Sequence, residues 1–277
     1  ADYRGALKAD FSDPKAIRFA GGYAQSCGEK AWAVAYADPK GYAKRAVQGM
    51  WQDMGGKLQG TVRMGTLAGT AAAAFKPVFE ARSAPLAEIV RDINKYSNNV
   101  MAQQVYLTLG RVLTPPTAVA GAGDAVTSPG SFEASHKVVQ RWWVDRMGAD
   151  DVPLLDNGSG LSRTERISAN ALGRMLQAAY ASPLMPELMG SLPINGVDGT
   201  LRRAKPRASG YAHLKTGSLN EVVAVAGYVH APAGKRYVLV AIVNHPNARA
   251  ARTAIETMTD WAYNSIVNSM HLTYLLG

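Results

Sequence analysis

The sequence predicts an α+β fold in which helices pack against an antiparallel sheet. Amphipathic helical patterns fill the middle of the chain, and two β-rich runs joined by a short Pro- and Gly-containing segment lie near its end. Helices followed by a hairpin and a final helix are typical of this fold class. The chain has 277 residues, of which 47% are apolar and 18% charged. It is therefore long enough and apolar enough to fold as a globular protein.

The first forty residues contain too little apolar patterning for a core of their own. Residues 31–36 have the composition of a short strand. Over residues 41–55, apolar side chains recur at helical spacing until a Gly-Gly pair ends the pattern. Residues 58–64 alternate in polarity and predict a strand.

The middle of the chain predicts three helices. The first begins at residues 83–85, where Ser and Pro are favoured helix-start residues. Its apolar positions follow the i, i+3, i+4, i+7 pattern, with Leu86, Ile89, Val90 and Ile93. The pattern breaks at residues 96–99, where a second helix begins. A Pro- and Gly-rich loop over residues 111–130 separates it from a third helix over residues 132–147.

The end of the chain predicts a β-hairpin and a closing helix. Residues 222–229 and 236–243 are rich in β-branched side chains, and residues 231–235 between them contain Pro and Gly. A long helical pattern follows over residues 248–267. The last part of the fold is therefore expected to be a hairpin covered by a helix.

The composition argues against several classes of protein. No run of about 18 apolar residues is present, so we expect no membrane-spanning helix. The net charge is +9, but the basic residues are scattered and no aromatic side chains alternate with them. We therefore expect no nucleic-acid binding, and attraction to an anionic cell-wall polymer fits the charge equally well. Neither a cofactor nor a metal site is predicted.

The single cysteine, Cys27, has no neighbours at metal-ligand spacing. It is interpreted as a partly buried thiol. A disulfide to a cysteine outside this chain is the alternative.

The segment Lys215-Thr216-Gly217-Ser218 is the strongest chemical signal. On a strand it presents a cation and a hydroxyl, and the glycine lets a ligand approach the backbone closely. The N–H of Ser218 is then placed to serve as half of an oxyanion hole. The alternative is an ordinary turn at the end of a strand.

A second signal is Ser97-Asn98-Asn99, in the break between two helices. Ser97 and Asn99 can direct a hydroxyl and an amide into a cleft. Alternatively, Ser97 or Asn98 only caps the second helix. Capping and catalysis are compatible, because a cap uses one residue and leaves another free.

Together the two segments indicate one chemistry. Ser-x-x-Lys, Ser-Asp-Asn and Lys-Thr-Gly form the joint signature of β-lactamases and penicillin-binding proteins. The second and third elements occur here in the right order, with Asn98 in place of Asp. Residues 155–163, 192–201 and 215–219 also resemble the class C low-molecular-mass penicillin-binding proteins, and this resemblance extends over residues 41–277.

The resemblance implies a fold and a function. The fold is a β-lactamase/transpeptidase-like antiparallel sheet flanked by helices, with a helical subdomain. Residues 1–40 are the tail of an inserted accessory domain, and residues 41–277 are the C-terminal part of the penicillin-binding domain. The activity is that of a serine-type D-alanyl-D-alanine carboxypeptidase or endopeptidase, which acts on peptidoglycan stem peptides through an acyl-enzyme and is inhibited by β-lactams. Such proteins are exported to the periplasm or cell surface, and a signal peptide is not found in this chain.

The resemblance also assigns roles to residues. Ser97 relays a proton between the nucleophile and the leaving amine, and Asn99 orients the substrate amide and the active-site lysine. Lys215 and Thr216 hold the terminal carboxylate of the peptide. Gly217 and Ser218 complete the substrate-binding strand.

The nucleophile is expected outside this chain, on an N-terminal segment of the same protein. The one Ser-x-x-Lys match is Ser12-Asp13-Pro14-Lys15, which lies only 85 residues before Ser97 and follows too short a segment. Two alternatives stay open: a β-lactamase-like hydrolase that uses Ser12, and a non-catalytic cell-wall binding module.

Two other polar residues have ordinary interpretations. Asp198 is interpreted as a turn former next to Gly199 that could border the cleft. His213 lies on the same strand face as Lys215 and is expected to be a packed or rim residue rather than a base.

Overall fold

The computed structural model describes residues 3–32, 34–65, 76, 80–112, 130–204 and 207–265. The chain divides into two compact units, residues 1–81 and residues 82–277. The prediction that an accessory domain ends at residue 40 stays a prediction. Within the described residues, no helix has the length and apolar character needed to cross a bilayer.

The first unit combines a short hairpin with one long helix. Its elements are α1 (Tyr3–Ala6), β1 (Leu7–Asp10), β2 (Arg18–Gly21), η1 (Gln25–Cys27) and α2 (Pro39–Asp53). Asp38 starts α2 by accepting a hydrogen bond from the N–H of Gly41 at 2.9 Å, and Pro39 occupies a favoured first-turn position. The helix predicted over residues 41–55 is therefore confirmed, with both ends shifted by two residues. Cys27 is a partly buried free thiol, as expected.

Two strand predictions in the first unit are wrong. The described residues of 31–36 and all of 58–64 lie outside any strand, whereas β1 and β2 pair antiparallel from Leu7↔Gly21 to Asp10↔Arg18. Gly60 has a φ of 107°, which breaks an extended conformation. A strand is stable only when it pairs with another strand, and the alternating polarity of residues 58–64 does not indicate whether such a partner exists.

The second unit contains the helices and the main sheet. Its helices are α4 (Leu86–Tyr96), α5 (Asn99–Val112), α6 (Phe132–Met147), α7 (Ala169–Tyr180), α8 (Met185–Ser191) and α9 (Ala251–Asn264), with short 3-10 turns η2 (Gly199–Leu201) and η3 (Ala248–Ala250). Its strands are β3 (Ala212–Leu219), β4 (Val222–His230) and β5 (Arg236–Asn244). The helix over residues 132–147 is confirmed at both ends, as is the break between α4 and α5. Part of the loop predicted over residues 111–130 and the end of the helix predicted over residues 248–267 lie outside the described residues.

The sheet has the order β3-β4-β5, and both pairs are antiparallel. The predicted hairpin is confirmed as β4 and β5. Its turn is closed by the N–H of Ala231, which donates to the carbonyl of Lys235 at 3.0 Å, and Gly234 supplies the positive φ of 81°. Strand β3 lies at the sheet edge.

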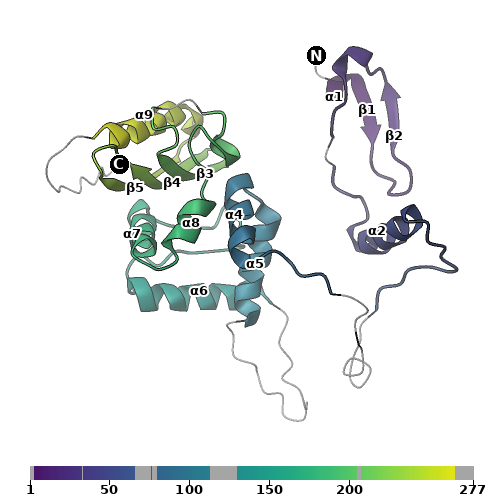
Figure 1. Ribbon diagram of the computed structural model, residues 1–277, viewed down its shortest axis with the longest axis horizontal. Helices are drawn as coiled ribbons and strands as arrows, with labels where there is room; N and C mark the ends of the chain where they lie inside the picture. Colours follow the sequence, from purple (N-terminus) through teal and green to yellow (C-terminus); the bar gives the residue numbers. More distant parts are fainter. Residues whose placement is uncertain are drawn as a thin grey trace, which may run out of the picture. The chain divides into compact units, whose positions relative to one another are not determined.

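Helices cover both faces of this sheet (Figure 1). One face packs on α9 through a buried cluster that includes Leu214, Val229 and Ala262. The other face packs on α7 and α8 through a cluster that includes Leu176 and Tyr228. Alternation along β3 therefore places Leu214 on the α9 face and Lys215 on the opposite face.

The helical subdomain continues from the α7 side of the sheet. Helices α5 and α6 pack closely at Gly110. A Cβ at this position would lie only 2.5 Å from the hydroxyl oxygen of Ser135, so the contact leaves no room for a side chain. A second cluster, formed by Trp143, Met147 and Ala171, joins α6 to α7. Helix α4 packs against α8. This packing brings the turn between α4 and α5 to the edge strand β3.

Candidate active site

Ser97 occupies a left-handed turn between α4 and α5. Its φ and ψ are 52° and 50°, and its N–H donates to the carbonyl of Ile93 to close the last turn of α4. A residue other than glycine costs about 1–2 kcal/mol in this conformation. Strained backbone conformations of this kind concentrate at functional sites, where they point a side chain in a direction that a regular helix or strand would not allow.

The two asparagines after Ser97 have separate roles. The side-chain oxygen of Asn98 accepts a hydrogen bond from the N–H of Met101 at 3.1 Å and so caps α5. Asn99 is the first residue of α5 and is half-buried. The expectation that Ser97 or Asn98 caps the second helix is therefore confirmed for Asn98.

The edge strand β3 presents backbone groups to the site. The N–H of Leu214 donates to the carbonyl of Pro193 at 2.9 Å, on the side away from β4. Successive residues of a strand alternate the direction of their N–H and C=O groups. The N–H groups of Thr216 and Ser218 therefore face the same outer edge as that of Leu214. The N–H of Ser218, the predicted oxyanion-hole donor, therefore points away from β4, and its role stays a prediction.

Lys215 joins the two sequence motifs. Its Nζ lies 2.5 Å from Oγ of Ser97 and 3.0 Å from the carbonyl oxygen of Thr216. Burial of the ammonium group lowers the pKa of Lys215 from its ordinary value. The cation that the sequence predicted is therefore desolvated and directed at the predicted hydroxyl.

Gly217 and Ser218 follow Lys215 on opposite faces of β3. A Cβ on Gly217 would meet only the Cβ of Ala224, at an ordinary contact distance of 3.6 Å, so the strand itself does not require glycine at this position. On the α9 face, the Oγ of Ser218 lies 3.5 Å from Nη2 of Arg252. Gly217 therefore leaves the face of β3 that carries Lys215 without a side chain at this position.

His213 is packed, as expected. Its Nδ1 lies 3.3 Å from the carbonyl oxygen of Met189 in α8, and its ring centroid lies 5.4 Å from that of His230. Desolvation lowers the pKa of both rings. No contact joins His213 to Ser97 among the described residues, and its side chain is partly buried.

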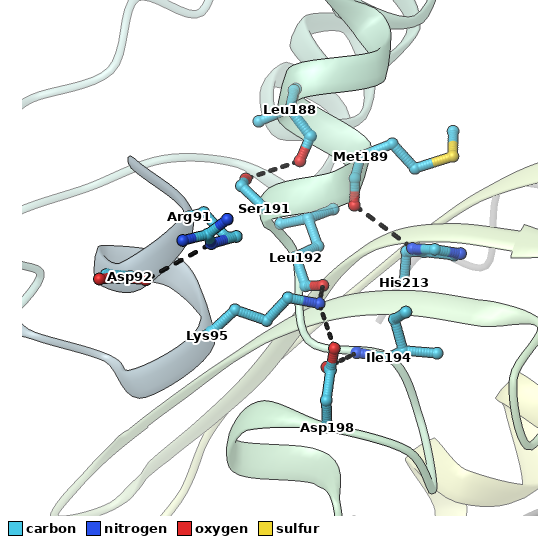
Figure 2. Close-up of polar contacts among 10 residues, drawn as sticks. All are labelled: Arg91, Asp92, Lys95, Leu188, Met189, Ser191, Leu192, Ile194, Asp198 and His213. Carbon is cyan, nitrogen blue, oxygen red and sulfur yellow. Dashed lines mark hydrogen bonds and ion pairs between the residues drawn. The ribbon is translucent and has the colours of Figure 1, made fainter. Parts of the chain in front are cut away.

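The sequence analysis did not predict an ion pair close to Ser97, between Lys95 and Asp198. Figure 2 shows Lys95 of α4 reaching the loop after α8, where its Nζ lies 2.6 Å from Oδ2 of Asp198 and 2.7 Å from the carbonyl oxygen of Leu192. Asp198 does lie in a turn, as expected, but it also pairs with a lysine two residues before Ser97. On a helical wheel Lys95 lies opposite the apolar positions Leu86, Ile89, Val90 and Ile93, so the sequence pattern gave no signal that it is buried.

Ser12 has a different environment. It lies in the first unit, in a turn between β1 and β2, and outside any helix. Its Oγ donates to Oδ1 of Asp10 at 2.6 Å. One helical turn does not connect Ser12 to Lys15 here, and that turn is what brings the two side chains of a Ser-x-x-Lys nucleophile together.

In the described part of the chain, no three His, Cys, Asp or Glu side chains cluster as metal ligands do.

The antiparallel sheet, the helices on its two faces and the helical subdomain form the transpeptidase-like fold of penicillin-binding proteins. The structure is similar to that of penicillin binding protein 4 from Haemophilus influenzae complexed with a β-lactam, with a TM-score of 0.64 and 22% sequence identity. This likeness covers 96% of the chain and 61% of the other protein.

Residues 6–265 match the D-Ala-D-Ala carboxypeptidase 3 (S13) family, and the chain belongs to that family. It is 32% identical over 157 residues to the carboxypeptidase DacB of Mycolicibacterium smegmatis, a match that covers 54% of the chain and 31% of the relative. It is 31% identical over 151 residues to a D-alanyl-D-alanine carboxypeptidase of Actinomadura, covering 52% of the chain and 26% of the relative. These matches span about a third or less of each relative's length.

Proposed function

We propose that this chain forms one part of the acyl-transfer site of a serine-type D-alanyl-D-alanine carboxypeptidase or endopeptidase. The contact between Lys215 and Ser97 carries the proposal, because it joins two motifs that have no common purpose in an ordinary strand or helix cap. Family membership supports the same activity. The substrate is the stem peptide of peptidoglycan, and β-lactams act as its mimics. The site of action is the periplasm or cell surface.

The nucleophilic serine comes, in this proposal, from a Ser-x-x-Lys segment of the same protein outside residues 1–277. The turn geometry of Ser12 and its bond to Asp10 support this choice. The domain assignment is part of the same proposal, with residues 1–40 as the tail of an accessory domain and residues 41–277 as part of the penicillin-binding domain.

The reaction proceeds in two steps. The serine oxygen attacks the carbonyl carbon of the penultimate D-alanine, the C–N bond breaks, and the terminal D-alanine leaves as an amine after it gains a proton. Water then attacks the ester, releases the shortened peptide and returns the serine hydroxyl. A β-lactam forms the same ester when its ring opens.

Each residue of the site has one role in this scheme. The hydroxyl of Ser97 passes the proton to the leaving amine, and the Asn99 amide orients the peptide. Lys215 and Thr216 hold the terminal carboxylate. The outward N–H of Ser218 stabilises the negative oxygen that develops on the carbonyl, while Gly217 lets the peptide approach the strand.

Release of D-alanine tests this function. The product of the complete reading frame, incubated with a synthetic peptide that ends in D-Ala-D-Ala, is expected to release D-alanine, and benzylpenicillin is expected to stop the release. Ser97→Ala and Lys215→Ala should each slow it strongly, whereas Glu133→Gln on the exposed surface of α6 should not. Reversible peptide binding without release would contradict the proposal and favour a binding module. Activity on cross-linked peptides alone would identify an endopeptidase.

A further inference from the structure

A buried ion pair lies behind the contact between Ser97 and Lys215. Lys95 is only 8% exposed, and it is the one buried charged residue in the part of the chain that the structure describes. Its partner Asp198 has a side chain that is 37% exposed. A lysine loses much hydration energy when it is buried in this way, so the pair calls for an explanation other than general stability.

The carboxylate of Asp198 binds two different segments. Oδ2 accepts from Nζ of Lys95, and Oδ1 accepts from the N–H of Ile194 at 2.7 Å (Figure 2). Nζ of Lys95 also donates to the carbonyl of Leu192. One ammonium and one carboxylate therefore hold both ends of residues 192–198 against the last turn of α4.

Neighbouring contacts reinforce this docking. The side-chain amide of Asn94 donates to Oγ of Ser191 at 2.8 Å. A Cβ on Gly199 would lie 2.6 Å from the carbonyl oxygen of Lys95, and Gly199 has a φ of +55°. The loop and the end of α4 thus touch through their backbones, with little room for either to move.

The same loop is also bonded to β3. The carbonyl of Pro193 accepts from the N–H of Leu214, and the N–H of Asn195 donates to the carbonyl of Ala212, both at 2.9 Å. Leu214 is the residue directly before Lys215. The loop therefore connects the helix that ends at Ser97 with the strand that carries Lys215.

These contacts form a closed circuit. It runs from Ser97 back to Lys95, across to Asp198 and its loop, along β3 to Lys215, and from Nζ of Lys215 back to Oγ of Ser97. A displacement of about 1 Å in a reacting group can lower an enzymatic rate about 100-fold. The circuit links the turn that carries Ser97 to the strand that carries Lys215 both directly and through the loop that holds Asp198.

We propose that Lys95 and Asp198 are positioning residues, which set the separation between Ser97 and Lys215 and thereby the rate of acyl transfer, without contacting the substrate. The effect on rate rests on the proposed function. The effect on the geometry of Lys215 is independent of it.

The first test measures acylation by benzylpenicillin, with the product of the complete reading frame and the variants Lys95→Met and Lys95→Met/Asp198→Asn. The double variant leaves no unpaired buried charge, so it is expected to unfold at nearly the wild-type temperature. Both variants should show a 10- to 100-fold lower rate constant for the acylation step, in line with the cost of misplacement. Glu133→Gln removes an exposed ion pair with the same 2.6 Å separation and should acylate as the wild type does.

The second test needs no acylation. In residues 1–277 labelled with [ε-¹³C]lysine, the NMR signal of Lys215 is identified by its loss in Lys215→Arg. It should shift in Lys95→Met and in the double variant, but not in Glu133→Gln. A folded double variant that keeps both the wild-type acylation rate and the Lys215 signal would overturn the proposal. A wild-type protein that is not acylated would count against the proposed function, and the Lys215 signal would then decide the positioning role alone.

Discussion

Nζ of Lys215 lies 2.5 Å from Oγ of Ser97, although 118 positions separate the two residues in the sequence. An ammonium group has donors and no acceptor, so the serine oxygen accepts this hydrogen bond. The hydroxyl proton of Ser97 is then free to point toward another group. This is the arrangement that a proton relay to a leaving amine requires.

Two substitutions of Ser97 separate backbone strain from chemistry. Ser97→Ala removes the hydroxyl and keeps a side chain in the left-handed conformation, whereas Ser97→Gly removes both the hydroxyl and the steric cost. The glycine variant is expected to be more stable than the alanine variant by about 1 kcal/mol in denaturant unfolding. Both should lose most acylation activity. An alanine variant as stable as the glycine variant would indicate that the turn is not left-handed in solution.

Two glycines of the sheet provide a matched comparison. A Cβ on Gly227 would lie 2.1 Å from the backbone oxygen of His213, so Gly227→Ala must push β3 away from β4. We expect it to cost about 1–3 kcal/mol in the free energy of unfolding.

Gly217→Ala should instead change stability by less than about 0.5 kcal/mol, because its Cβ meets only Ala224 at 3.6 Å. It should nevertheless slow acylation, since the methyl group would stand on the face of β3 that carries Lys215, where the proposed substrate binds. Normal acylation by this variant would remove Gly217 from the substrate-binding residues.

The stability of the fold should depend on the ionisation of His213. Desolvation, aided by the positive charge of Lys95, lowers the pKa of His213 below the ordinary histidine value of 6.5, and desolvation lowers the pKa of His230 as well. The unfolded chain therefore binds more protons than the folded chain between the lowered pKa and about 6.5. Stability should rise with pH through that window and be lost as the pH falls.

The measurement is the thermal unfolding temperature at pH 5.5 and pH 7.5. The wild type should unfold at a lower temperature at pH 5.5, and His213→Gln should show a smaller difference between the two conditions. An equal difference in both proteins would mean that His213 is as hydrated in the folded state as in the unfolded chain.

Gly199 and Gly173 test the contact between α4 and the loop that holds Asp198. Gly199→Ala adds a Cβ 2.6 Å from the carbonyl oxygen of Lys95, at a positive φ, and is expected to destabilise the fold by about 1–3 kcal/mol. In α7, a Cβ on Gly173 would have nothing within 4 Å, so Gly173→Ala should stabilise by about 0.5–1 kcal/mol. Denaturant unfolding measures both, and a neutral Gly199→Ala would contradict the close backbone contact.

Local patterns predicted the parts of the fold that depend on near neighbours. The hairpin of β4 and β5, the limits of α6 and the break at Ser97 all follow from spacing and turn residues. The β1–β2 hairpin was missed, because four-residue strands are too short to show a period of two. Helices α7 and α8 were also not anticipated.

Long-range partners could not be predicted in the same way. The motifs Ser97–Asn99 and Lys215–Ser218 were found because their residue types indicate a shared chemistry. Lys95 and Asp198 are 103 positions apart and belong to no such signature, so only the folded chain reveals their pairing. Contacts of this kind depend on how α4 packs against the loop that holds Asp198, and the spacing of residues in the sequence gives no information about that packing.

The most direct test of the whole account is denaturing intact-mass spectrometry after incubation with benzylpenicillin, performed on residues 1–277 and on the product of the complete reading frame. A β-lactam that acylates a serine adds its whole mass to the protein. We expect residues 1–277 to stay unmodified and the complete product to gain one adduct, located by peptide mapping on a Ser-x-x-Lys segment outside this chain. An adduct within residues 1–277, with Ser12 as the first suspect, would contradict the account.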